Sequence, residues 1–184
     1  MIYTGVGSRA TPAAVQARMI KIAHLLGEAG WTLRSGGAEG ADAAFEHGAG
    51  LVTALGPYPN MEIYLPWKGF NGRPRVSPPY FWDAHYPEAA ELLAADIHPA
   101  WDMCTHGAKM LHTRNIHQVV GLDMKTHSQA VVCWTLDGFL RGGTRTALVL
   151  ARSLDIPIWN LARGDAADLS ADRIAIQVLA SPAA

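Results

Sequence analysis

Short glycine-rich segments occur three times in this sequence, each where an apolar run gives way to a helical pattern. They are Gly7-Ser8-Arg9, Ser35-Gly36-Gly37 and Gly142-Gly143-Thr144. Glycine lets backbone N–H groups approach an anion closely, and the N-terminus of a helix adds unpaired donors and a favourable dipole. A single segment of this kind is more often only a tight turn. Three of them after successive strands indicate a cradle for the phosphate or ribose of a nucleotide-like ligand.

Charged side chains at these turns could add phosphate binding or acid–base chemistry to what the backbone offers. Arg9 stands directly at the first turn, where a guanidinium suits bidentate binding of phosphate, so we expect it to contact the ligand. We expect Arg34 instead to pair with a carboxylate. Glu39 and Asp42 flank the second turn and have two interpretations: a solvated turn residue and a helix-capping residue, or the acid and base of a reaction.

Several familiar site types are excluded by the residues present. No turn ends in Gly-Lys-Ser/Thr, and Gly5-Val6-Gly7 lacks the third glycine of the dinucleotide fingerprint, so neither ATP hydrolysis nor hydride transfer is indicated and we expect no cofactor. His106, His112 and His117 stand five or six residues apart, a spacing that does not place them on one helical face. Because the zinc patterns Cys-x-x-Cys and His-Glu-x-x-His are also missing, we expect no metal site.

Strands alternating with helices are expected to position the turns. The expected strands cover residues 1–6, 31–34, 61–65, 130–134 and 156–159. The first expected helix starts at Pro12, and the others cover residues 43–47, 87–97, 108–122, 147–151 and 172–179. Thr11 is predicted to cap the first helix. The unbroken apolar run 130–134 indicates a strand buried on both faces of a sheet. The predicted fold class is α/β, a Rossmann-like parallel sheet with helices on both faces, which binds ligands at the carboxyl ends of its strands.

One further segment, at about residues 66–87, is rich in proline and aromatic residues. We expect an ordered loop there, because aromatic side chains favour burial and disordered tracts are poor in them. Trp67 and Phe70 could stack on a base, although aromatic residues on such a loop more often anchor it to its own domain.

Composition sets the outer limits of these interpretations. With 184 residues and 49% hydrophobic content, residues 1–184 are expected to form a single domain. With a net charge of −1, the chain lacks the overall excess of positive charge that is typical of a dedicated nucleic-acid-binding protein. No apolar stretch approaches the roughly 20 residues of a membrane span, and the start lacks the features of a signal peptide. We therefore expect a cytoplasmic protein, no membrane partner, and reduced thiols at Cys104 and Cys133.

Taken together, the motifs resemble the SLOG superfamily, which groups DprA (Smf) proteins with LOG-type nucleotide hydrolases. They are most similar to the small DprA-like proteins of bacteriophages. The resemblance covers roughly residues 1–161 and rests on residues 7–9, 33–42, 63–71, 111–115 and 142–147. It implies a nucleotide or nucleotide-derived ligand over the strand ends, and LOG-type relatives imply a homo-oligomer such as a dimer. It also adds Arg114 and Asn115 to the expected ligand-binding residues, which are Gly7, Ser8, Arg9, Ser35, Gly36, Gly37, Asp42, Arg114, Asn115, Gly142, Gly143 and Thr144.

Three functions remain open, and the sequence favours them in the following order. The first is a nucleotide-binding sensor or sequestering protein, which needs only what the turns offer. The second is a hydrolase of the N-glycosidic bond of nucleoside monophosphates, a phosphoribohydrolase. The third is a DprA-like mediator that binds single-stranded DNA and loads a recombinase, against which the balanced charge counts.

The hydrolase interpretation is weakened by one substitution. Arg114 resembles the arginine of the LOG hydrolases, but Ala147 stands near the position of their glutamate. Any catalytic role would then fall to Glu39, Asp42 or Arg114. For Arg114, ligand binding predicts that replacement by alanine weakens nucleotide affinity and leaves the melting temperature almost unchanged.

Overall fold

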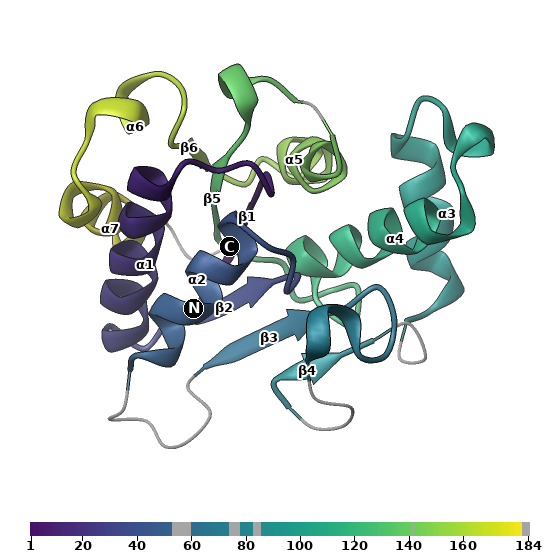
Figure 1. Cartoon of the computed structure of the whole chain (residues 1–184), viewed down its shortest axis with the longest axis horizontal. Helices are drawn as coiled ribbons and strands as arrows, with labels where there is room; N and C mark the ends of the chain where they lie inside the picture. The colour runs from purple at the N-terminus through teal and green to yellow at the C-terminus, as the bar shows by residue number, and fades with distance from the viewer. Residues whose placement is uncertain (53–59, 74–77, 83–85, 141, 182–184) are drawn as a thin grey trace.

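The computed structural model describes residues 1–52, 60–73, 78–82, 86–140 and 142–181. Within these ranges six strands form one parallel sheet in the order β4-β3-β2-β1-β5-β6 (Figure 1). The strands are β1 (Ile2–Gly7), β2 (Thr32–Ser35), β3 (Met61–Tyr64), β4 (Tyr80–Phe81), β5 (Ala130–Trp134) and β6 (Ile158–Asn160). The predicted α/β, Rossmann-like class is confirmed. Because the strands are parallel, their carboxyl ends share one edge of the sheet, which we call the carboxyl edge.

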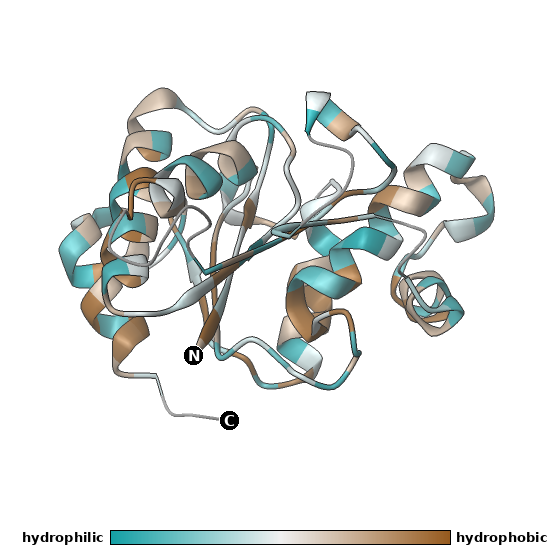
Figure 2. Ribbon diagram, turned by 90° about the horizontal axis from the view of Figure 1, so that it is seen from below, coloured by the Kyte–Doolittle hydropathy of each residue, from teal (hydrophilic) through white to brown (hydrophobic). Residues whose placement is uncertain are grey.

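Helices cover both faces of the sheet. One face carries α1 (Ala13–Glu28), α2 (Ala41–Gly50) and α7 (Ala171–Leu179), and the other carries α3 (Glu88–Ile97), α4 (His106–Val120) and α5 (Thr144–Ser153). Shorter elements are η1 (Phe70–Gly72), η3 (Trp101–Met103), η4 (Leu136–Gly138) and α6 (Asp165–Asp168). In Figure 2 hydrophobic stretches lie along the central strands, with helices on either side. None of the helices in the described ranges is long and apolar enough to cross a membrane.

Strand β5 shows how the sequence builds two cores from one sheet. All five of its residues are buried, and successive side chains point to opposite faces. Val132 and Trp134 join the core beneath α1 and α2, whereas Val131 and Cys133 join the core beneath α4 and α5. Burial on both faces, predicted from the unbroken apolar run, is confirmed. Cys133 is a buried free thiol, and Cys104 is also free.

Two local predictions are wrong. Thr11 does not cap α1: Pro12 occupies the N-cap position without a side-chain bond, and the Thr11 hydroxyl donates to the carbonyl of Ser8 at 2.7 Å. The Thr11 hydroxyl therefore stabilises the first glycine turn rather than the N-terminus of α1. The second error lies in residues 66–87, where β4 joins the edge of the sheet beside β3. A strand of two residues is too short to show the alternation by which strands are recognised.

Close packing of α1 on α2 depends on Gly48. A Cβ at Gly48 would lie 2.2 Å from the carbonyl oxygen of Ile20, whereas a Cβ at Gly50, in the same helix, would meet no atom within 4 Å. We expect Gly48→Ala to lower the free energy of unfolding by about 1–3 kcal/mol through overpacking. Gly50→Ala should raise it by about 0.4–1 kcal/mol, because alanine restricts the unfolded chain. Urea denaturation of both variants tests the packing, and similar effects at the two positions would contradict it.

Candidate functional site

A buried ion pair lies under the carboxyl edge and joins α2 to α4. Arg114 Nη1 donates to Asp42 Oδ2 at 3.2 Å, and neither side chain is more than 5% exposed. The same carboxylate oxygen accepts the backbone N–H of Ala38, in the second glycine turn, at 3.3 Å. Burial raises the pKa of the Asp42 carboxyl, while Arg114 and the N–H groups of Ala38 and Gly7 oppose that rise. Asp42 is therefore held by the first turn, the second turn and α4 together.

The Arg114 guanidinium lies directly against the backbone of Gly36. A Cβ at position 36 would lie 1.1 Å from Arg114 Nη1, so the arginine can occupy this place only because residue 36 is glycine. Gln118 completes the contact: in the amide orientation that satisfies both of its polar atoms, its oxygen accepts from Gly36 N at 2.8 Å and from Arg114 Nη1 at 3.2 Å. The second glycine turn is thus filled by the protein's own side chains.

Gln118 was not among the residues expected at the site. It lies four residues after Arg114 and therefore on the same face of α4, which is the signal that could have identified it.

The other two turns reach the same edge. Asn115 Nδ2 donates to the carbonyl of Gly143 at 2.6 Å, so neighbouring residues of α4 contact the second and third turns. In the first turn, Ser8 N donates to the carbonyl of Trp134, the last residue of β5, at 3.1 Å. Segments far apart in the sequence therefore meet along one edge, as the parallel sheet predicts.

Solvent exposure divides the expected ligand-binding residues into two groups. The buried ones are Ser35, Gly36, Gly37, Asp42, Arg114 and Asn115, and the ones at least partly exposed are Gly7, Ser8, Arg9, Gly142, Gly143 and Thr144. We call Ser8, Arg9 and Gly142–Thr144 the exposed edge. The buried group is packed against other parts of the chain, so of the expected ligand-binding residues only the exposed edge and Gly7 are in contact with solvent.

The N-terminus of α5 is the most open part of the exposed edge. Gly143 occupies the N-cap position and supplies no capping side chain, and of the first-turn N–H groups that of Arg145 donates to the carbonyl of Gly142 at 3.2 Å. A Cβ at Gly142 or Gly143 would meet no atom within 4 Å. Backbone N–H groups of the first helical turn that lack a cap are suited to binding an anion.

The remaining expected residues have structural explanations or stand apart. Arg34 donates to Glu62 at 2.7 Å and to the carbonyl of Thr126, which confirms its expected pairing with a carboxylate. Glu39 is exposed. Ala147 is completely buried among the apolar residues beneath α4 and α5, so the position near which the LOG hydrolases carry a glutamate faces the core here.

Aromatic residues of the proline-rich segment anchor it to the domain, since Phe70, Tyr80 and Trp82 pack on the core and Tyr86 stacks on His117. The rings of Trp67 and Phe70 form an edge-to-face pair with centroids 5.1 Å apart, and Phe70 packs on the core. Trp67 remains 37% exposed.

A cavity of about 400 Å³ lies beside the end of β6, and sequence reasoning did not identify it. Its lining includes Asn160, the last residue of the strand, and the basic side chains Arg152 and Arg163. The volume lies within the usual range for small-molecule sites, roughly 300–1,000 Å³.

Comparison with known proteins gives one informative likeness. No protein-family model and no curated protein matches the sequence. Among solved structures the fold is similar to that of DNA processing protein A from Helicobacter pylori, which was determined to examine its single-stranded DNA binding mode. The TM-score is 0.59 over 97% of this chain and 80% of that chain, at 15% sequence identity. At this identity the likeness shows a DprA-like fold.

The buried ion pair changes the expected effect of replacing Arg114. Arg114→Ala would leave the Asp42 carboxylate buried and unpaired, so we expect a loss of about 3–5 kcal/mol in the free energy of unfolding. The sequence alone had suggested an unchanged melting temperature. The double variant Asp42→Ala/Arg114→Ala should lose less than the sum of the two single variants.

Lys21→Ala is the matched control, because Lys21 forms an ion pair with Asp172 in which both side chains are more than half exposed. We expect it to change stability by at most about 1 kcal/mol. Urea denaturation measures all four variants. If Arg114→Ala unfolds at the same urea concentration as the unmodified protein, the pair does not hold the edge together.

Proposed function

We propose that this chain binds single-stranded DNA through phosphate contacts along the exposed edge. The observation that carries the proposal is the uncapped N-terminus of α5 at Gly143, on the same edge of the sheet as the exposed Arg9. The DprA-like fold supports it, since the similar solved structure belongs to a protein studied for binding single-stranded DNA.

The chemistry of the exposed edge suits a phosphodiester. The N-terminus of α5 contributes backbone donors and a positive dipole end, and Arg9 contributes a guanidinium that can bind two phosphate oxygens. The connection between β5 and α5 also presents Leu136, whose side chain is 54% exposed. Exposed apolar surface beside phosphate donors gives an unpaired base a surface to pack on.

Net charge limits how this binding would work. With a formal charge of −1 the chain has no excess of positive charge to attract DNA over long distances. The affinity would depend on a few local contacts, so it should fall only modestly as the salt concentration rises. Each phosphate neutralised should make the slope of log K against log[salt] more negative by about 0.7.

A free nucleotide is the second candidate ligand, and the cavity beside β6 favours it. Arg152 and Arg163, the basic side chains of its lining, could bind the phosphate of such a nucleotide. This arrangement corresponds to the sensor or sequestering function. Competition between an oligonucleotide and mononucleotides separates the two proposals, because a strand along the exposed edge spans several phosphates and a mononucleotide only one.

Binding of a fluorescent oligothymidylate, followed by anisotropy at low salt, tests the first proposal. Arg9→Ala should weaken binding about tenfold, the effect of losing one charge-assisted hydrogen bond at an exposed site, and should reduce the salt slope by about 0.7. Gly143→Asp should weaken binding further by placing a carboxylate at the proposed phosphate site. It should leave the melting temperature unchanged or raised, since an acidic residue favours a helix N-terminus.

Lys125→Ala provides the control for loss of a positive charge. Lys125 is exposed and lies in the connection from α4 to β5, at the opposite edge of the sheet. It should leave DNA affinity unchanged. Equal weakening by Arg9→Ala and Lys125→Ala would refute a specific edge, and full displacement of the oligonucleotide by equimolar thymidine monophosphate would favour the free nucleotide.

Hydrolysis of nucleotides is expected to be absent. Ala147 is buried, and the Asp42 carboxylate is already bound by Arg114 and Ala38. Glu39 alone then offers an exposed carboxylate beside the second turn. Incubation with the four common nucleoside monophosphates should release no free base, as followed by chromatography. Rapid release that is lost in Glu39→Gln would instead establish a phosphoribohydrolase.

A further inference from the structure

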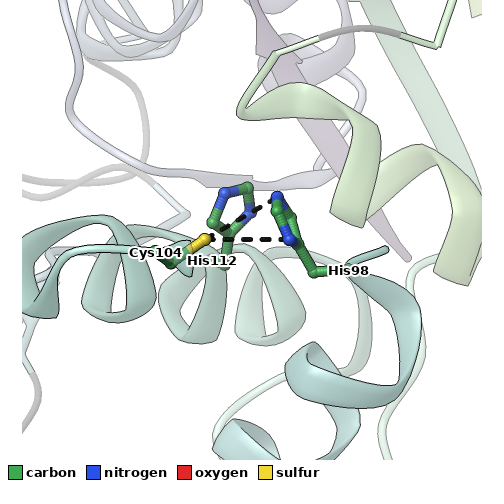
Figure 3. A group of neighbouring side chains, drawn as sticks. All are labelled: His98, Cys104 and His112. Atoms are coloured by element: carbon green, nitrogen blue, oxygen red, sulfur yellow. Dashed lines mark hydrogen bonds between the residues drawn. The ribbon is translucent and has the colours of Figure 1, made fainter. Parts of the chain in front are cut away.

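Two histidines and one cysteine from three different elements meet on the side of the sheet that carries α3, α4 and α5 (Figure 3). His98 follows the last residue of α3, Cys104 follows η3, and His112 lies in α4. No metal site was expected from the sequence, because the spacing of His112 from His106 and His117 does not place these histidines on one helical face. The grouping instead depends on the turn that folds α3 back onto α4.

The distances within this cluster approach those of a metal centre. Cys104 Sγ lies 3.7 Å from His98 Nδ1 and 3.9 Å from His98 Nε2, and potential donor atoms of all three residues lie within 4.8 Å of one another. Ligand atoms around a tetrahedral zinc ion, at about 2.0–2.3 Å from it, are roughly 3.3–3.8 Å apart. The longest separation in the cluster therefore needs to shorten by at most about 1.5 Å for the cluster to bind zinc.

A buried hydroxyl orients one of the rings. His112 Nδ1 forms a 2.7 Å hydrogen bond with Thr146 Oγ1, and Thr146 is completely buried in the first turn of α5. This bond leaves Nε2 of His112 as the nitrogen available to a metal. Metal-binding histidines characteristically bond their second nitrogen to a fixed group of the protein in this way.

Access from solvent also suits a metal ligand set. His98 and Cys104 are partly exposed, which gives an ion a path from solvent and room for a water molecule.

We propose that His98, Cys104 and His112 form a zinc site with two imidazole ligands, one thiolate and a water molecule in the fourth position. Two nitrogens and one sulfur are ligands of the softness that Zn²⁺ favours, and three protein ligands with one open position are the pattern of an accessible zinc site. Binding releases the thiol proton of Cys104 to solvent. The ion would link the end of α3 and η3 to α4. This link would lie next to the first turn of α5, where Thr146 bonds His112.

Zinc chloride alone is the probe for this site, applied to tag-free, chelator-treated protein. Calorimetry should give one zinc per chain, and zinc at about a hundred times its dissociation constant should raise the melting temperature by about 5–10 °C. Cobalt chloride should give a thiolate-to-cobalt charge-transfer absorption in the near ultraviolet. Thr146→Val, which keeps the side-chain shape but removes the hydroxyl, should weaken zinc binding about tenfold.

Cys104→Ala and Cys133→Ala form the matched pair of variants. Cys104→Ala should abolish the charge-transfer absorption and weaken zinc binding at least tenfold. Cys133→Ala, in the buried core, should leave both unchanged. His98→Gln gives a second test at a partly exposed position and should also weaken binding at least tenfold.

Three outcomes would overturn the proposal. The first is the absence of zinc uptake by protein with a normal melting curve, and the second is an unchanged cobalt spectrum in Cys104→Ala. The third is uptake of Cu(I) but not Zn²⁺, which would contradict the assignment to zinc.

Discussion

The ion pair between Asp42 and Arg114 is the constraint on which the carboxyl edge depends. A charge taken out of water must be paired and hydrogen-bonded from several sides. Asp42 meets this requirement through Ala38 and Arg114, and Arg114 meets part of it through Gln118. The carboxyl edge is therefore assembled around one buried pair of charges. This pair fixes the relative positions of the turns on which a ligand would bind.

Helix α4 distributes the consequences of that constraint. Arg114 faces α2 and the second glycine turn, Asn115 reaches the third turn at Gly143, and His112 bonds Thr146 in the first turn of α5. One helix thus positions the buried charges, the open N-terminus of α5 and the proposed zinc ligands. Because these contacts come from neighbouring residues, a shift of α4 would move the exposed edge and the zinc cluster together.

Two roles of glycine can be distinguished at this edge. Gly36 is required because the protein's own guanidinium occupies the space that a side chain would need. Gly142 and Gly143 face open space, so their backbone remains accessible. A glycine-rich motif can therefore serve internal packing in one turn and ligand contact in another, and the two uses look the same in a sequence. Single-stranded DNA and free nucleotides both present the phosphate chemistry that the accessible turn would bind.

The sequence by itself determined the α/β class, the buried strand β5 and the convergence of the three turns, because these follow from local apolar patterns and from the geometry of parallel sheets. It did not determine which members of the turns face solvent. Arg9 and Arg114 are the same residue type, but Arg9 is exposed at the first glycine turn and Arg114 is buried in an ion pair with Asp42 that joins α4 to α2 across the carboxyl edge. The two-residue strand β4 and the grouping of His98 with Cys104 and His112 were also decided by tertiary structure. In each case the deciding contact joins segments that no local periodicity relates, and burial rather than residue type sets what each side chain can bind.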